Sequence, residues 1–265
     1  MDNAAKTAYL VVDTESVPDG RLLSRIKYAK EEITPEEAIR RAQEEARQRS
    51  RDGSDFLPFS YQYPVAVCVI RVGADFKLQK ITCLDAPEFR PRLIVKQFWE
   101  GLVKVNAGLV TFNGRGFDLP LLELAAFRYG VSGGRDWFLT NRNRNKDRHF
   151  DIMAWLTNYG ACHLTGGLNL LAKLLGKPGK MEFAGDKVYG LYQAGKLQQI
   201  NDYCLFDTLD TYFAFLRTRV LIGTLSLEQE HAVVLHAKEL LATKLAEFPG
   251  LRGYLDNWGD WDPWP

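Results

Sequence analysis

Two acidic residues directly follow a short apolar strand near the start of the chain. Residues 9–16 read Tyr-Leu-Val-Val-Asp-Thr-Glu-Ser, and the run from Leu10 to Val12 is typical of a buried β-strand. Asp13 and Glu15 come next, separated by one residue. Because side chains alternate between the two faces of an extended chain, both carboxylates would lie on the same side. The stretch therefore predicts two negative charges at the edge of an apolar sheet.

Two carboxylates held together in this way repel each other and lose hydration. A divalent cation between them removes the repulsion, and hard oxygen ligands suit Mg²⁺ or Mn²⁺. The simpler alternative is a strand that ends in a solvated acidic turn, and a lone Asp-x-Glu favours that alternative. Two further acidic motifs later in the chain favour the metal site.

The charge balance limits how the chain could bind an acidic partner. Its 265 residues contain 34 Lys and Arg against 33 Asp and Glu, so the net charge is +1. A nucleic acid would therefore have to be held by local basic patches and metal ions rather than by the overall field. A hydrophobic share of 46% is enough for one sizeable core.

The cysteines and the apolar runs bear on where in the cell the protein is expected to reside. Cys68, Cys83, Cys162 and Cys204 are scattered without a Cys-x-x-Cys pair, as expected of buried thiols in a reducing environment. No stretch reaches the roughly 18 apolar residues of a membrane span, and the first residues lack a signal-peptide pattern. A cytoplasmic protein with no membrane partner is expected.

The first half of the chain predicts an α/β arrangement. Residues 21–51 are polar and favour a surface helical insertion, with a helix start at Thr34-Pro35, that could overhang the end of the first strand. A solvated helix of no functional weight is the alternative. Strands over 64–72 and 76–84 are expected to form a hairpin, and a helix is expected over 91–105.

A second acidic motif follows the next apolar strand, Leu109 to Phe112. The chain continues as Asn-Gly-Arg-Gly-Phe-Asp from Asn113 to Asp118, and a helix is predicted from Leu119 to Tyr129. Asp118 stands where a helix N-cap belongs, so capping alone could explain it. The two glycines allow a tight turn that brings the backbone close to a ligand.

The loop over residues 135–148 is the most concentrated basic and aromatic segment. It contains Arg142 and Arg144 among asparagines, with Trp137 and Phe138 beside them. Such a loop could follow a phosphate backbone and stack a base. A solvated loop is the alternative.

The last third of the chain is predicted to be mainly helical. Asp151 fits the N-cap of a helix, and longer helices are expected over 167–175, 197–216 and 227–248. The second of these carries Tyr203 and Asp207, which are four residues apart and so lie on one face of the helix.

The expected domain organisation is simple. Residues 1–250 would form a single domain that includes the insertion and the helix over 227–248. Residues 251–265 are rich in Trp and Asp and are expected to be a mobile tail, which could dock a protein partner.

Together, the three acidic motifs resemble those of the DEDD superfamily of 3′–5′ exonucleases, in the subgroup with a tyrosine in the third motif. An Asp-x-Glu ends the first strand, an Asn-(x)₃-Phe-Asp follows a later strand, and a Tyr-(x)₃-Asp lies on a late helix. Within this superfamily, the motifs are most similar to those of the proofreading domain of family-B DNA polymerases. The resemblance spans roughly Tyr9 to Leu221, without a polymerase palm or fingers.

The resemblance implies a ribonuclease H-like α/β fold, a mixed central sheet flanked by helices. It also implies two divalent ions, Mg²⁺ or Mn²⁺, and a tyrosine that positions the attacking water. The implied metal ligands are Asp13, Glu15, Asp118 and Asp207, and the tyrosine is Tyr203. Substrate contacts are expected at Thr14, Asn113, Phe117, Arg142 and Arg144, with Lys173, Lys177 and Lys180 as weaker candidates.

The implied function is metal-dependent 3′–5′ exonuclease activity, with single-stranded DNA or mismatched 3′ ends favoured as substrates. An exoribonuclease and a non-catalytic nucleic-acid-binding module are the alternatives. A haloacid dehalogenase-type phosphatase is disfavoured because its second acid is an aspartate, whereas this chain has Glu15 there and shows no clear late Asp-Asp or Gly-Asp motif. The insertion and the hairpin do not map clearly onto the polymerase domain.

Overall fold

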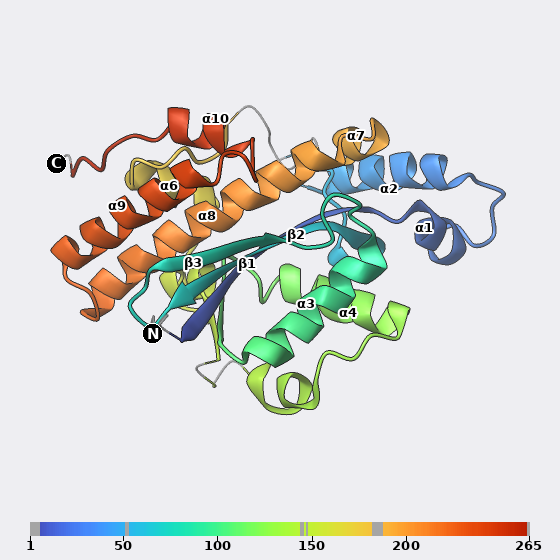
Figure 1. Cartoon of the computed structure of the whole chain (residues 1–265). Coiled ribbons are helices and arrows are strands. Elements are labelled where there is room, and N and C mark those ends of the chain that lie inside the picture. The colour runs from blue at the N-terminus through green and yellow to red at the C-terminus, as the bar shows by residue number, and fades with distance from the viewer. Residues whose placement is uncertain (1–5, 51–52, 144–145, 147, 182–187, 264–265) are drawn as a thin grey trace.

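A computed structural model describes residues 6–50, 53–143, 146, 148–181 and 188–263, which are arranged around a mixed sheet (Figure 1). The described strands lie in the order β3-β2-β1-β4-β5. Strand β1 pairs antiparallel with β2 and parallel with β4, while β3 is antiparallel to β2 and β5 is parallel to β4. Their bounds are Thr7–Pro18 (β1), Gln62–Gly73 (β2), Leu78–Cys83 (β3), Gly108–Thr111 (β4) and His149–Asp151 (β5). The hairpin expected over 64–84 is confirmed as β2 and β3.

Helices cover both faces of this sheet, as the family resemblance implies (Figure 1). Helices α3 and α4 pack on one face and the long helix α8 crosses the other. None of the described helices is long and apolar enough to cross a bilayer. Their bounds are Gly20–Ile26 (α1), Pro35–Arg49 (α2), Pro91–Val105 (α3), Asp118–Tyr129 (α4), Ile152–Leu156 (α5), Gly167–Leu174 (α6), Val188–Gln193 (α7), Leu197–Ile222 (α8), Leu227–Thr243 (α9) and Leu251–Asp256 (α10).

Strand β1 separates two hydrophobic clusters by simple alternation. Leu10 and Val12 belong to the cluster beneath α3 and α4, whereas Val11 and Val17 belong to the cluster beneath α8. This period of two is the one inferred from the sequence. Side chains at positions 13 and 15 therefore share the α8 side of the strand.

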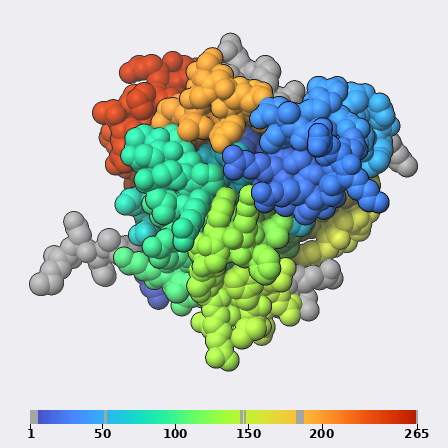
Figure 2. Space-filling model, turned by 90° about the vertical axis from the view of Figure 1, so that its right-hand side faces the viewer, coloured from blue at the N-terminus to red at the C-terminus, as the bar shows by residue number. Residues whose placement is uncertain are grey.

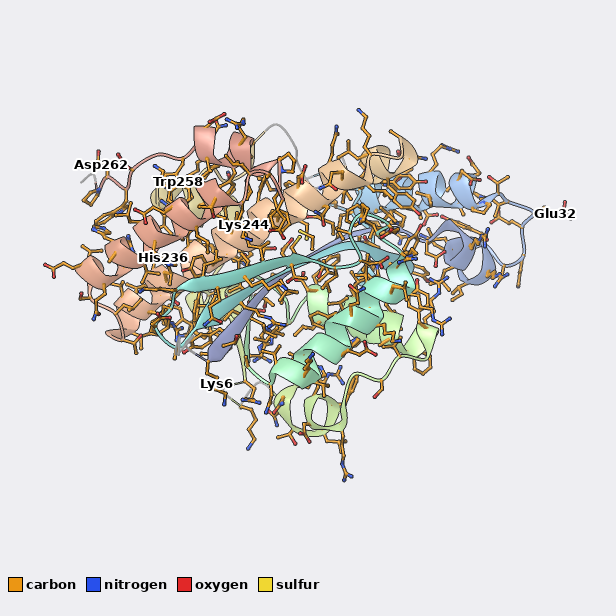
Figure 3. The ribbon with its side chains drawn as sticks, in the orientation of Figure 1. Lys6, Glu32, His236, Lys244, Trp258 and Asp262 are labelled. Carbon is orange, nitrogen blue, oxygen red and sulfur yellow. The ribbon has the colours of Figure 1, made fainter. Side chains whose placement is uncertain are left out.

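The polar insertion forms a small unit at the carboxyl end of β1 (Figure 1). The Asp19 N–H donates to the Tyr61 carbonyl oxygen at 2.8 Å, which closes the insertion at its base. Glu32 lies at its outermost tip (Figure 3). The insertion differs from the expected all-surface helix because it buries a cluster of its own, made of Leu23, Tyr28, Ala38, Ile39, Ala42 and Leu57.

The C-terminal segment is where the sequence-based organisation is wrong. Helix α9 ends at Thr243 rather than at Phe248, and residues predicted to begin a mobile tail form α10 instead. Leu251 and Tyr254 are fully buried in the main core, and the Trp258 ring packs against Phe213 at 5.0 Å between ring centroids. The chain then runs from Trp258 to Asp262 on the α9 side of the sheet (Figure 3). These contacts contradict a boundary at residue 250.

Candidate metal centre

Strand β1 and helix α8 bring three carboxylates into one group. Asp13, Glu15 and Asp207 each offer one oxygen, and these three atoms lie within 4.8 Å of one another. The first two come from the α8 side of β1, and Asp207 comes from the middle of α8. The geometric expectation that distant acids converge holds for this trio.

The contact between α8 and β1 is fixed at the same point. The Cys204 thiol donates to the Asp13 carbonyl oxygen at 3.3 Å. Tyr203 precedes this cysteine and is only 7% exposed. Burial, together with the negative charge of Asp207, raises the pKa of Tyr203 well above its usual 10.0, so its hydroxyl keeps its proton at neutral pH.

Asp118 enters the site from the first turn of α4. It is not the helix N-cap, as its position in the sequence had suggested, because Phe117 occupies that position and makes no side-chain cap. The buried Asp118 carboxylate instead lies close enough to raise the pKa of both Asp13 and Glu15. Asp118 is not one of the three residues whose oxygens lie within 4.8 Å of one another, but its negative charge acts on two of them.

The loop that leads to Asp118 is shaped by Asp151. Its two carboxylate oxygens accept the N–H groups of Asn113, at 3.0 Å, and Arg115, at 2.8 Å. One of these oxygens also accepts the Ala154 N–H at the start of α5, which is the N-cap role expected from the sequence. Gly114 is required for close packing, since a Cβ there would lie 2.3 Å from Thr111 Oγ1. Asp151 is thus a positioning residue for the second acidic motif.

The four carboxylates are costly to bury without a cation. Burial is the largest cause of a rise in the pKa of Asp13 and of Glu15, and the neighbouring acids add to it. Burial also raises the pKa of Asp118 to about 7 and that of Asp207 to about 6. Asp13 Oδ2 is buried with no hydrogen-bond partner among the described residues. Buried carboxylate oxygens that lack donors fit a hard divalent ion.

One lysine partly offsets this charge. Lys180 lowers the pKa of both Glu15 and Asp207 by its positive charge, although the sequence had singled it out only as a weak backbone contact. Lys177, expected to have the same role, is instead buried under the Trp258 ring, with its Nζ 4.3 Å from the ring centroid. It is therefore part of the packing of the C-terminal segment.

The residues expected to contact the substrate fall into different surroundings. Thr14 is buried, and its side chain and backbone N–H lie close enough to Asp118 to lower the pKa of that carboxylate. Asn113 is exposed in the loop before α4, in a left-handed conformation with φ of 61°. Arg142 forms an ion pair with Glu123 of α4 at 2.9 Å, and Arg144 lies outside the described residues.

Phe117 has an aromatic neighbour that sequence reasoning missed. Its ring lies 5.3 Å from that of Phe56, a residue of the segment after α2 whose side chain is 55% exposed. Phe117 directly precedes Asp118 in the chain, so this ring pair belongs to the loop that leads to the carboxylate. A single phenylalanine in a polar loop gives no periodic signal, and only the fold brings it to Phe117.

Comparison with known proteins identifies a family for most of the chain. A family model described as a predicted 3′–5′ exonuclease related to the exonuclease domain of PolB matches residues 54–258. The matched part contains Asp118, Tyr203 and Asp207, while Asp13 and Glu15 precede it on β1. None of the curated proteins compared with the chain matches it.

The match covers well over half of the chain and accords with the architecture. A mixed five-stranded sheet flanked by helices is consistent with the ribonuclease H-like exonuclease fold expected from the sequence, and the phosphatase alternative loses its support. The chain belongs to the family of predicted 3′–5′ exonucleases related to the exonuclease domain of PolB.

Proposed function

We propose that this protein is a metal-dependent 3′–5′ exonuclease that hydrolyses nucleic acid with two divalent ions, Mg²⁺ or Mn²⁺. The proposed substrates are single-stranded DNA and mismatched 3′ ends. The observation that carries the proposal is the convergence of Asp13, Glu15 and Asp207 within 4.8 Å, next to a buried Asp118. The insertion and helices α9 and α10 would be additions to one exonuclease domain, in a reducing compartment such as the cytoplasm.

The donor set suits the ions that this chemistry requires. Asp13, Glu15, Asp118 and Asp207 would hold the metal, because desolvation raises the pKa of all four carboxylates. Bound divalent ions supply a hydroxide at neutral pH and stabilise charge on the attacking and leaving oxygens of a phosphodiester. Repulsion between the acids would at the same time be relieved.

Tyr203 would orient the attacking water rather than act as the base. Its hydroxyl is protonated at neutral pH and burial raises its pKa further, so it would orient the water by a hydrogen bond and would not take up its proton. The paired rings of Phe56 and Phe117 would contact the terminal nucleotides, and Lys180, whose charge acts on Asp207, would lie near their phosphates.

The test uses an oligonucleotide labelled at its 5′ end, so that removal of nucleotides from the 3′ end gives a ladder of shortened products. We expect a ladder with Mn²⁺ or Mg²⁺ and none with EDTA or with a blocked 3′ end. Asp13→Asn and Asp207→Asn should abolish the ladder, and Tyr203→Phe should slow it without stopping it. Asp202→Asn, on the same helix beside Tyr203 but outside the carboxylate group, should trim at the parental rate.

The same assay decides the substrate class. Single-stranded DNA, duplex DNA with a mismatched 3′ end and RNA are digested side by side. Faster trimming of RNA would replace the DNA proposal with an exoribonuclease. Parental trimming by both Asp variants would overturn the assignment of the site, and binding without trimming under every metal condition would favour a non-catalytic module.

A further inference from the structure

A cleft of about 520 Å³ lies at the carboxyl end of β1. Its walls come from the end of β1, from the α1–α2 insertion, from the C-terminal end of α4 and from α7. These parts meet on one face of the molecule, where α1 and α2 are blue, α4 is green and α7 is at the start of the orange segment (Figure 2). The residues that line the cleft include four tyrosines, Tyr63, Tyr129, Tyr189 and Tyr192.

The four tyrosines converge from three separate elements, and each is half-buried. The rings of Tyr63 and Tyr192 meet edge-on, with centroids 6.2 Å apart, and their hydroxyls lie 3.2 Å apart. Tyr129 has the Arg128 guanidinium 5.8 Å from its ring centroid. Partly exposed rings held in fixed positions around a cleft are suited to stacking with flat groups.

The cleft is near enough to the carboxylates for one nucleic-acid strand to contact both. Pro18 at its edge is three residues beyond Glu15 on β1, a distance of about 10 Å along an extended strand. Arg128 is ten residues beyond Asp118 on α4, or about 15 Å along the helix. A stacked nucleic-acid strand advances about 3.4 Å per base, so three to five bases span this interval.

The charges in the cleft are nearly balanced. The lining holds two basic residues, Arg21 and Arg128, and two acidic ones, Asp19 and Glu36, and Arg128 is already paired with Asp19. A ligand held mainly through its phosphates would need an excess of basic groups, which this cleft lacks. Stacking of unpaired bases on tyrosines needs no such excess.

We propose that this cleft binds unpaired bases of a single-stranded nucleic acid, three to five nucleotides upstream of the 3′ end that occupies the metal centre. The proposal rests on the proposed exonuclease function for the direction of the strand. Several of the walls, including Arg21, Pro35 and Ile39, belong to the insertion, which precedes the part of the chain matched by the family. The cleft would thus add to this chain a preference for single strands of a minimum length.

The test measures binding separately from hydrolysis. Fluorescence anisotropy with labelled oligothymidylates of 3 and 12 nucleotides, in Ca²⁺ to prevent turnover, gives Kd for the parent and for Tyr129→Leu and Tyr189→Leu. We expect each variant to bind the 12-mer on the order of tenfold more weakly, the loss of one stacked base, and to bind the 3-mer like the parent. The salt dependence of the 12-mer affinity should stay unchanged, because no phosphate contact is lost.

Two controls make the result specific. Tyr129→Phe keeps the aromatic ring and should bind the 12-mer like the parent. Phe127→Leu removes an aromatic ring that is 87% exposed on the same helix but does not line the cleft, and it should have no effect. Circular dichroism and Tm establish that each variant is folded.

Three results would overturn the cleft proposal. They are parental binding of the 12-mer by both Leu variants, an equal loss with the 3-mer, or an equal loss in Phe127→Leu. Because the assay reads binding alone, an absence of hydrolysis would count against the proposed exonuclease activity and leave the cleft result standing.

Discussion

Each of the four clustered acids is unfavourable without a partner of opposite charge. Asp13, Glu15, Asp118 and Asp207 have raised pKa values chiefly because they are buried, and in Asp13 and Glu15 the neighbouring acids add to the rise. The folded protein therefore favours either protons or a cation at these oxygens. Both possibilities can be measured without any knowledge of the substrate.

The first prediction concerns metal binding. Mn²⁺ at about 100 times its Kd should stabilise the parent by roughly 2.7 kcal/mol, because it binds only the folded state. For a chain of this size, that corresponds to a rise in Tm of about 5–10 °C. Asp207→Asn should lose this rise, yet its metal-free Tm should be no lower than that of the parent, because a buried charge has been removed. Differential scanning calorimetry with and without Mn²⁺ makes the measurement.

Asp202→Asn is the matched control, since this residue lies on the same helix outside the carboxylate group, and it should keep the full response to Mn²⁺. A parental Mn²⁺ response in Asp207→Asn would mean that the ion binds elsewhere.

The second prediction concerns pH in the metal-free protein. The pKa of Asp118 is about 7 in the folded state, above its ordinary value of 3.8, so the folded state binds the proton more tightly than the unfolded state. This contribution to stability is fully present below pH 3.8 and is lost as the pH rises through 7. Between pH 5 and 8 the parent should lose on the order of 2 kcal/mol more free energy of unfolding than Asp118→Asn.

Urea unfolding in EDTA at the two pH values measures that difference. Adding Mn²⁺ at pH 8 should restore stability to the parent. Equal pH dependence in the two proteins would show that Asp118 ionises normally.

Single residues also show where sequence reasoning ends. A period of two placed Asp13 and Glu15 on one side of a strand, and a spacing of four placed Tyr203 and Asp207 on one face of a helix. Only the resemblance to exonuclease motifs implied that the two pairs meet. The supporting roles of Asp151 and Phe56 could not be predicted. They depend on how β5 and the segment after α2 pack beside the Asp118 loop, and no local spacing encodes that packing.

At the scale of elements, α10 shows how position in the chain can mislead. The position of residues 251–265 at the end of the sequence suggested a mobile tail, and a helix of six residues is too short to show a clear period. Its stability comes from tertiary contacts. The Tyr254 hydroxyl donates to Asp210 Oδ1 at 2.6 Å, and both side chains are buried between α8 and α10.

The third prediction tests this bond. Tyr254→Phe leaves the Asp210 carboxylate buried without its donor, and it should destabilise the protein by about 1–3 kcal/mol. Limited proteolysis should then cut the chain after residue 250 faster than in the parent. Asp256→Asn, on the exposed side of the same helix, should change neither stability nor cleavage. An unchanged Tm in Tyr254→Phe would mean that ring packing alone holds α10.

At the scale of the whole molecule, most of the sheet and its helices were predictable and the insertion was only partly so. Apolar runs marked β1 to β4 and the change to a helical period marked α3, α4 and α8, whereas the mixed sheet was implied by the family resemblance and the three-residue β5 was not expected. The insertion carries few apolar residues, and its small cluster forms only because α1 and α2 pack against each other. Its placement over the end of β1 follows from the pairing of β1 with β2, since Pro18 lies opposite Gln62.

The fourth prediction is that the insertion can be removed without loss of the fold or of the metal centre. Asp19 and Tyr61 are already joined by a backbone hydrogen bond of 2.8 Å, so a two-residue Asn-Gly turn in place of residues 20–60 should connect the two strands as a hairpin. The shortened protein should keep its circular dichroism spectrum and its Mn²⁺-induced rise in Tm, because the four carboxylates lie outside the deletion.

The same deletion removes Phe56 and one wall of the tyrosine-lined cleft, so affinity for a 12-mer should fall further than in either single tyrosine variant. Loss of the Mn²⁺ response in a folded deletion protein would instead place the insertion within the metal centre. Parental affinity for the 12-mer would leave the insertion with no part in holding the strand.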